Sequence, residues 1–167
     1  MRVWTLVAAA VVLAGWGSSG QAEQPVQGFA VPVAQPVKVE LVSEHASIQP
    51  GGSMRIGVHF TLEDGWHIYA QNPGDAGLPT SVEWGAPGGI SIGPLIWPPH
   101  QEFVEAGDIR TFGYIGDVVL SSELKAAPSL MPGVEQPISA RVKWLACKEI
   151  CLPGEAKLQI KLPVSSG

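Results

Sequence analysis

Alternation of apolar and polar residues is the dominant pattern of the chain from Val37 onward. In MRIGVHFTL (54–62) every second residue is apolar, and polar or small residues occupy the positions between them. The same period of two recurs in ISARVKW (138–144) and KLQIKL (157–162). Alternation over this many residues is typical of β-strands that bury one face. We therefore expect strands in all three segments, with the apolar set of each pointing into a core.

Five further segments have a weaker β-pattern and are separated by turn signals. Gly and Pro punctuate the chain between them, in QPGGS, EDG, NPGDAGLP, APGG, WPPH and MPG. No long stretch keeps the 3.6-residue spacing of an amphipathic helix. The five segments are VKVELV (37–42), WHIY (66–69), SVEW (81–84), ISIGPLIW (90–97) and DVVLSSEL (117–124). The pattern predicts an all-β fold, an immunoglobulin-like sandwich of about eight short antiparallel strands.

The first 22 residues have the composition of a secretory signal peptide. Arg2 precedes an apolar run over residues 3–13, and GQA (20–22) offers a small-residue cleavage site before Glu23. The apolar run is short for a stable membrane span, and an N-terminal membrane anchor is the alternative interpretation. In either case the rest of the chain is expected to face an oxidising compartment, where disulfides persist.

Cleavage at that site would leave 145 residues, the size of one domain. Residues 23–36 (EQPVQGFAVPVAQP) are rich in Pro, Gln and small side chains, which predicts a flexible lead-in. The domain itself is therefore expected to comprise residues 37–167. No later run reaches the ~18 apolar residues of a spanning helix, so we expect no stable membrane insertion after cleavage.

The charge of the chain argues against two classes of partner. Residues 1–22 carry a single charge, Arg2, and its removal changes the formal net charge from −5 to −6. The remaining Lys and Arg residues form no cluster. A mildly acidic chain of this kind is not typical of proteins that bind nucleic acid or anionic lipid.

Both cysteines of the chain lie in WLACKEICLPGEA (144–156), with three residues between them. The even-numbered residues of 138–144 are expected to point inward, so Cys147 points outward if the strand continues. The even-numbered apolar residues of 157–162 give Cys151 the same outward direction, provided that Pro153-Gly154 does not break the register. A tight turn through residues 148–150 would place the two opposite each other in a hairpin, with Cα atoms ~4.5–5.5 Å apart and within disulfide range. We therefore expect two neighbouring sulfur atoms outside the main core.

Spacing alone leaves three interpretations of the pair open: a structural disulfide, a redox-active disulfide and a metal site. Closing a loop of about five residues stabilises by only ~2 kcal/mol, against ~4.7 kcal/mol for a 100-residue loop. Short or exposed disulfides also tend to be the reducible ones. Zinc needs four ligands, whereas Cu(I) could use both thiolates. The histidines lack ligand spacing; they are His45, His59, His67 and His100.

Cysteine-protease chemistry is also a weak interpretation of the pair. It requires one thiolate beside a histidine, and a second cysteine three residues away would quench that thiolate as a disulfide. Dithiol exchange has no such difficulty, because one sulfur attacks and the other resolves the mixed disulfide.

Three segments of the chain resemble the N-terminal periplasmic (alpha) domain of the thiol:disulfide interchange protein family DsbD, and more closely the form in the related suppressor-of-copper-sensitivity protein ScsB. They are EDGWHIYAQNPGDAGLPTSVEW (63–84), IWPPHQEFVEAGDIRTFGYIGDVVL (96–120) and VKWLACKEICLPGEAKLQI (142–160). The resemblance implies an immunoglobulin-like periplasmic domain with a redox-active cysteine pair and no bound cofactor. DsbD-type domains have more residues between their cysteines and continue into a membrane domain and a thioredoxin-like domain.

The resemblance also implies a role for each cysteine. Cys151 matches the cysteine that forms mixed disulfides with partners, and Cys147 matches its resolving companion. The family collects electrons delivered across the inner membrane, so a thioredoxin-fold protein, a membrane electron-transfer protein or both are the expected partners of a monomeric domain. Two alternatives remain: a copper-protective module that uses the same sulfurs with His67 or His100, and a β-sandwich interaction module without catalysis.

A short cap loop with an aromatic residue covers the disulfide in this family. HQEFVEAG (100–107) aligns with that loop, which places Phe103 over the sulfurs and Glu102 beside them. WHIY aligns with a segment whose aromatic hydroxyls line the site, which puts Tyr69 nearby, together with His67 where better-known relatives have tyrosine. An apolar ring over the sulfurs would disfavour a thiolate and slow unwanted attack.

Two charged residues lie between the cysteines. Lys148 is the adjacent cation that would favour a thiolate, and Glu149 opposes it.

Overall fold

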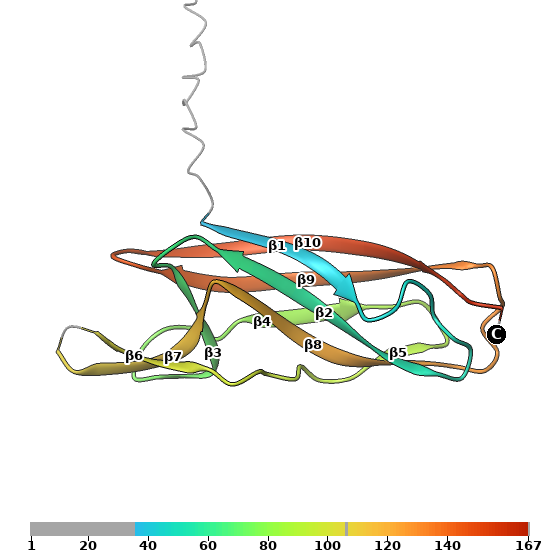
Figure 1. The fold of residues 1–167 in the computed structure, drawn as a ribbon, viewed down its shortest axis with the longest axis horizontal. Coiled ribbons are helices and arrows are strands. Elements are labelled where there is room, and N and C mark those ends of the chain that lie inside the picture. The colour runs from blue at the N-terminus through green and yellow to red at the C-terminus, as the bar shows by residue number, and fades with distance from the viewer. Residues whose placement is uncertain (1–35, 106, 167) are drawn as a thin grey trace, which may run out of the picture. The chain divides into compact units, whose positions relative to one another are not determined.

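The structure, a computed structural model, describes residues 36–105 and 107–166. These residues form ten β-strands in two sheets, shown in Figure 1, and none of them belongs to an apolar helix long enough to cross a membrane. The predicted signal peptide and all of the predicted lead-in except Pro36 lie outside the described residues.

All the strands pair antiparallel with their neighbours, which confirms the predicted all-β, immunoglobulin-like sandwich. The first sheet has the order β1 (Val37–Ser43), β2 (Ser53–Leu62), β8 (Asp117–Ala126) and β5 (Ile90–Ile92). The second has the order β10 (Cys151–Pro163), β9 (Glu135–Cys147), β3 (His67–Gly74), β7 (Ile109–Ile115) and β6 (Gln101–Glu105). The short β4 (Ser81–Gly85) pairs with β9 beside β3.

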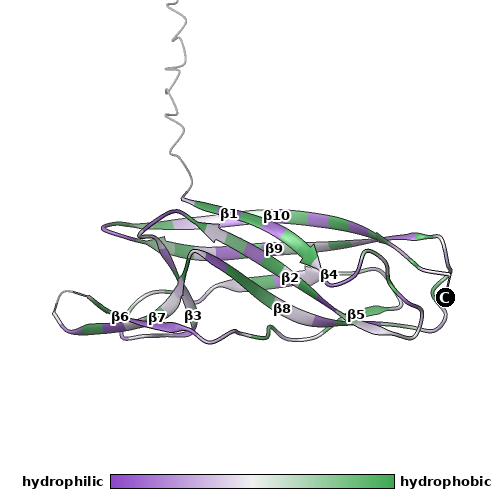
Figure 2. Ribbon diagram, viewed as in Figure 1, coloured by the Kyte–Doolittle hydropathy of each residue, from purple (hydrophilic) through white to green (hydrophobic). Residues whose placement is uncertain are grey.

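The core forms between the apolar faces that the alternation predicts, and Figure 2 shows the alternating hydropathy along β8, β9 and β10. The five alternating apolar residues of β2 are buried, as are the four predicted for residues 138–144 of β9; they are Met54, Ile56, Val58, Phe60, Leu62, Ile138, Ala140, Val142 and Trp144. Phe60 meets the ring of Trp144 edge-on, with centroids 5.9 Å apart, and so joins the two sheets.

In the described residues the structure has ten strands where about eight short ones were expected. Strand β6, within the segment aligned with a cap loop, and β7, which follows that segment, form a hairpin that the alternation did not reveal, because charged residues and Gly113 interrupt its pattern. Strands β9 and β10 have 13 residues each and are not short. In addition, the strand expected over 90–97 ends at Ile92, where Gly93 and Pro94 follow, and Ile96 forms only an isolated bridge to β8.

The β9–β10 hairpin keeps one register from Cys147↔Cys151 to Glu135↔Pro163. The Pro153-Gly154 step leaves that register intact because Gly154 lies directly against the indole of its partner Trp144. A Cβ at Gly154 would come within 2.2 Å of that ring, closer than real Cβ contacts allow. The glycine therefore lets the two strands stay paired around a large buried side chain.

A charged cluster lies on the outer face of the first sheet. The two ring nitrogens of His59 lie 3.1 Å from a carboxylate oxygen of Glu40 and 2.9 Å from one of Asp117. The hydrogen bond to His59 is the main cause of the lowered pKa of Glu40, and the hydroxyl of Thr61 is the main cause of the lowered pKa of Asp117. Both carboxylates are exposed, so salt screens these interactions.

We expect acid to weaken the fold through these two carboxylates. A carboxyl whose pKa is lower in the folded than in the unfolded state stabilises the fold above its ordinary pKa, which is 4.5 for Glu40 and 3.8 for Asp117. That stability is lost as the pH falls through the lowered pKa of the folded state. Urea unfolding midpoints between pH 6 and pH 3 should therefore fall more for the wild-type chain than for a Glu40→Gln, Asp117→Asn double variant. Equal losses in the two proteins at low salt would contradict this expectation.

Candidate functional site

The two cysteines form a disulfide at one end of the β9–β10 hairpin. Cys147 ends β9, Cys151 begins β10, and the two face each other in the register with Cα atoms 4.1 Å apart. The turn between them closes with a hydrogen bond from the Lys148 amide to the Ile150 carbonyl, 3.0 Å long. The hairpin and the neighbouring sulfurs are as the spacing and parity predict.

The two halves of the disulfide differ in exposure. Cys151 is exposed, whereas Cys147 is only 3% exposed. The expectation that both sulfurs lie outside the core is therefore wrong for Cys147, although its outward parity is correct. The reason is that β3 pairs with the other edge of β9 and sets His67 opposite Cys147, so that side chains of β3 cover the outer face at this point.

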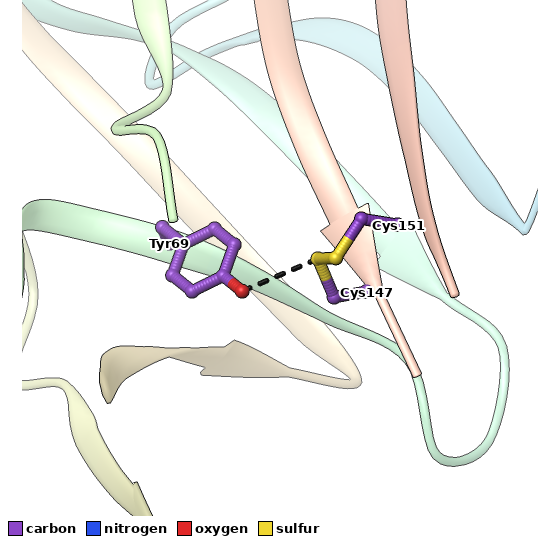
Figure 3. Close-up of a disulfide and its surroundings, with 3 residues drawn as sticks. All are labelled: Tyr69, Cys147 and Cys151. Atoms are coloured by element: carbon purple, nitrogen blue, oxygen red, sulfur yellow. Dashed lines mark hydrogen bonds between the residues drawn. A yellow bond between two sulfur atoms is a disulfide. The ribbon is translucent and has the colours of Figure 1, made fainter. Parts of the chain in front are cut away.

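Tyr69 forms a hydrogen bond with the sulfur of the buried Cys147. Its hydroxyl donates a hydrogen bond to Cys147 Sγ, 3.2 Å away, and Figure 3 shows the hydroxyl directed at that atom. The ring is 2% exposed and packs against the backbone of Gly77, where a Cβ would lie 2.4 Å from it. The positive φ of Gly77, 97°, also favours glycine at this position. The loop after β3 thus fixes the direction of the hydroxyl.

A row of rings leads away from Tyr69 across the outer face of the sheet. His67 meets Tyr69 edge-on with centroids 5.1 Å apart, and Phe103 stacks on His67 at 4.8 Å with an interplanar angle of 25°. Phe103 belongs to β6, two strands from β3, and two strand spacings amount to ~9.6 Å in a flat sheet. The β6–β7 hairpin, called the cap hairpin from here on, therefore curls over the face that carries the disulfide.

Glu102 faces the other way. Alternation along β6 puts it on the opposite face from Phe103, and its carboxylate accepts a hydrogen bond from Arg110 of β7 at 2.6 Å. The structure therefore separates Glu102 from the other candidate residues, which it brings together on one face: Cys147, Cys151, Tyr69, His67 and Phe103.

Lys148 has a role that the sequence did not suggest. Its ammonium donates a hydrogen bond to the Asp64 carbonyl, 3.0 Å away, in the turn between β2 and β3. The side chain lies against Gly65, whose φ is +81° and where a Cβ would come within 2.8 Å of Lys148 Cε. The contact ties the cysteine hairpin to a turn 84 residues away. Local patterns carry no signal of such a long-range contact.

Within residues 36–105 and 107–166, no three His, Cys, Asp or Glu side chains gather closely enough to hold a metal ion. The histidines of the metal alternative lie in other settings: His67 in the row of rings, and His100 against Phe112 with ring centroids 5.1 Å apart.

We expect Tyr69→Phe to slow reduction of the disulfide about tenfold. A hydrogen bond to a charged group contributes ~1.5–3 kcal/mol, and this one would stabilise Cys147 as it leaves as a thiolate. The rate of native-state reduction by dithiothreitol, followed by thiol labelling, measures the effect. Tyr114→Phe is the matched control, because the Tyr114 hydroxyl donates to the Pro98 carbonyl instead. Equal rates for Tyr69→Phe and the wild-type chain would contradict the assignment.

The fold and the site define an immunoglobulin-like β-sandwich domain with an asymmetrically exposed disulfide between neighbouring strands. Residues 34–163 match the family model described as thiol:disulfide interchange protein DsbD, N-terminal, and the chain belongs to this family. No curated protein sequence matches it.

The solved structures that are similar to the chain include two N-terminal domains. The N-terminal periplasmic domain of ScsB from Proteus mirabilis is 23% identical with a TM-score of 0.59, over 83% of this chain and 51% of that one. The N-terminal domain of Neisseria meningitidis DsbD in the reduced form is 14% identical with a TM-score of 0.41, over 75% of this chain and 85% of that one. The chain thus spans about half the length of the ScsB domain, and that similarity shows a shared fold.

Proposed function

We propose that this domain carries electrons in the periplasm by exchanging its Cys147–Cys151 disulfide with the thiols of a partner protein. The observation that carries the proposal is the asymmetry of the pair. Cys151 is exposed, whereas Cys147 is buried and its Sγ accepts a hydrogen bond from the Tyr69 hydroxyl. A structural staple needs neither feature. Membership of the DsbD N-terminal family supports the same chemistry.

The exposure of the two residues assigns their roles in the exchange. A partner thiolate attacks the accessible Cys151 Sγ, the Cys147–Cys151 bond breaks, and a mixed disulfide forms with Cys151. Cys147 leaves as a thiolate beside the hydroxyl of Tyr69, which stabilises the negative charge. A second partner thiol then attacks the partner's sulfur in the mixed disulfide. The result is a dithiol here and a disulfide in the partner, with two electrons and two protons transferred; the relative potentials set the direction.

The cap hairpin protects the pair between exchanges. Phe103 and His67 cover the side of the site next to Cys147, which limits the approach of stray thiols to that buried sulfur. Glu102, on the opposite face of the cap hairpin from Phe103 and in an ion pair with Arg110, acts by holding the two cap strands together. Loss of either Phe103 or this ion pair would make the buried sulfur easier to reach.

A thioredoxin-fold protein and a membrane electron-transfer protein are the partners that this family implies, and the domain acts as a monomer without a cofactor. The predicted signal peptide at residues 1–22 and family membership support a periplasmic location.

Reduction of the native protein tests the proposed function. Thiol labelling and mass spectrometry after incubation with graded dithiothreitol should show both cysteines becoming labelled while the fold remains intact. The double variant Cys147→Ser, Cys151→Ser shows the background labelling. A disulfide that resists millimolar dithiothreitol in the folded protein, and opens only with denaturant, would contradict the proposal.

A further inference from the structure

The edge of β10 next to Cys151 has unpaired backbone groups. Among the described residues, β10 pairs only with β9. The Cα separation of 4.1 Å between Cys147 and Cys151 is typical of the narrow antiparallel pair. In such a pair the backbone amide and carbonyl of each residue form no hydrogen bond with the residue opposite. The amide and carbonyl of Cys151 therefore point away from β9. Pro163 has the same parity, and its carbonyl accepts a hydrogen bond from Ile48, outside β9, as this assignment requires.

The same edge is the side from which Cys151 can be attacked. Displacement at a disulfide sulfur is in line, so the incoming thiolate approaches opposite the sulfur that leaves. Cys147 lies on the β9 side of Cys151. The approach to Cys151 is thus from beyond β10, where its backbone groups are also unpaired, and not from the side of Phe103 and the cap hairpin.

We propose that the partner presents its cysteine in an extended segment that adds as a strand to the β10 edge, with that cysteine opposite Cys151. This inference rests on the proposed function. A residue hydrogen-bonded opposite Cys151 in an antiparallel ladder would have its Cα ~5.5 Å away, in the middle of the range that disulfides span. Opposed side chains share a face of the sheet, so the partner's sulfur continues the row of Cys147 and Cys151.

The surroundings of the edge indicate the chemistry of this segment. Residues on either side of the partner's cysteine would point to the inner face of the added strand. On that face a hollow of about 400 Å³ lies between β1 and β10, which run side by side in Figure 1. Apolar side chains contribute most of its lining, among them Val37, Val39, Trp144 and Ala156. A cysteine with apolar neighbours in a segment able to become a strand is the partner sequence that fits.

The electron balance is that of the proposed exchange, with the partner dithiol as reductant. The first step joins the partner's sulfur to Cys151 and releases Cys147 as a thiolate, and strand addition changes only how the attacking sulfur is positioned. The backbone hydrogen bonds hold that sulfur at its target and so raise the rate of this step.

Three thiol probes test the strand addition on the oxidised full-length protein. The first is an eight-residue Val- and Thr-rich peptide with one central cysteine. The second is the same peptide with alternate backbone amides N-methylated, so that the edge facing β10 cannot donate hydrogen bonds. The third is glutathione, which reports whether the disulfide exchanges at all. Mass spectrometry measures the rate at which each probe forms a mixed disulfide with Cys151.

We expect the plain peptide to react at least tenfold faster than its N-methylated form. Equal rates for the two peptides, with normal glutathione exchange, would overturn strand addition and leave the proposed function standing. Failure of all three probes would overturn both. A dimer in light scattering together with equal peptide rates would assign the edge to a second copy and also overturn the proposal.

A pair of protein variants provides a second test. Glu155→Pro removes an outward-pointing amide next to the site, and proline is tolerated on edge strands at such positions. Lys161→Pro is the matched control at the same parity, far from Cys151 along β10. Glu155→Pro should remove the advantage of the plain peptide while glutathione exchange stays normal, and Lys161→Pro should keep it. An unchanged advantage in a folded Glu155→Pro protein would contradict the proposal.

Discussion

Alkylation of the single-cysteine variants is expected to differ by at least about a hundredfold, which corresponds to a local opening free energy of about 2.7 kcal/mol for the buried position. Cys151 should react rapidly with iodoacetamide in a Cys147→Ser protein. Cys147 should react slowly in a Cys151→Ser protein, because it is 3% exposed beneath Tyr69. The same asymmetry should make Cys147→Ser accumulate mixed disulfides with partners, while Cys151→Ser forms few.

Mass spectrometry of quenched time points gives both alkylation rates under identical conditions. The control is alkylation of each variant in denaturant, where the two rates should converge because folding no longer shields either thiol. Faster labelling of Cys147 than of Cys151 in the folded proteins would reverse the assigned roles. Equal rates in the folded state would show that the cover provided by β3 and the cap hairpin opens freely.

Truncation of Phe60 is expected to have the largest effect on stability. Phe60 is fully buried and contacts the ring of Trp144 across the sandwich. Replacing such a phenylalanine by alanine costs ~3–5 kcal/mol in the free energy of unfolding, because it removes buried area and leaves a cavity. Denaturant unfolding of Phe60→Ala, with the disulfide intact, measures this loss.

Met131→Ala is the control for the core truncation. Met131 is 68% exposed, and surface substitutions of this kind change the free energy of unfolding by less than ~0.5 kcal/mol. A loss below ~1 kcal/mol for Phe60→Ala would mean that the two sheets do not depend on the contact between Phe60 and Trp144.

Parity accounts for the parts of the site that local sequence could predict. The alternation along residues 138–144 places Cys147 on the outer face, and three intervening residues are enough for a tight hairpin turn. Those two facts determine that the sulfurs meet, because neighbouring residues in a narrow antiparallel pair lie within bonding distance.

The cap hairpin shows where local patterns fail. Alternation is clear when one face of a strand is buried in the core and the other is in water. On one face of strands β6 and β7, Thr111 is buried and Phe103 is half-buried. On the other face, Phe112 packs against the core beside the exposed Glu102. Their apolar residues therefore do not follow the pattern of a core strand.

The amino-acid sequence alone determined the all-β class, the inward faces of residues 54–62, 138–144 and 157–162, and the proximity of the two cysteines, because these follow from periodicity and short spacing. Only the tertiary structure decided which cysteine is covered. That outcome depends on β3 lying beside β9, on the Tyr69 hydroxyl reaching Cys147 from 78 residues away, and on the free edge of β10. Contacts between residues so distant along the chain arise only when the sheets assemble.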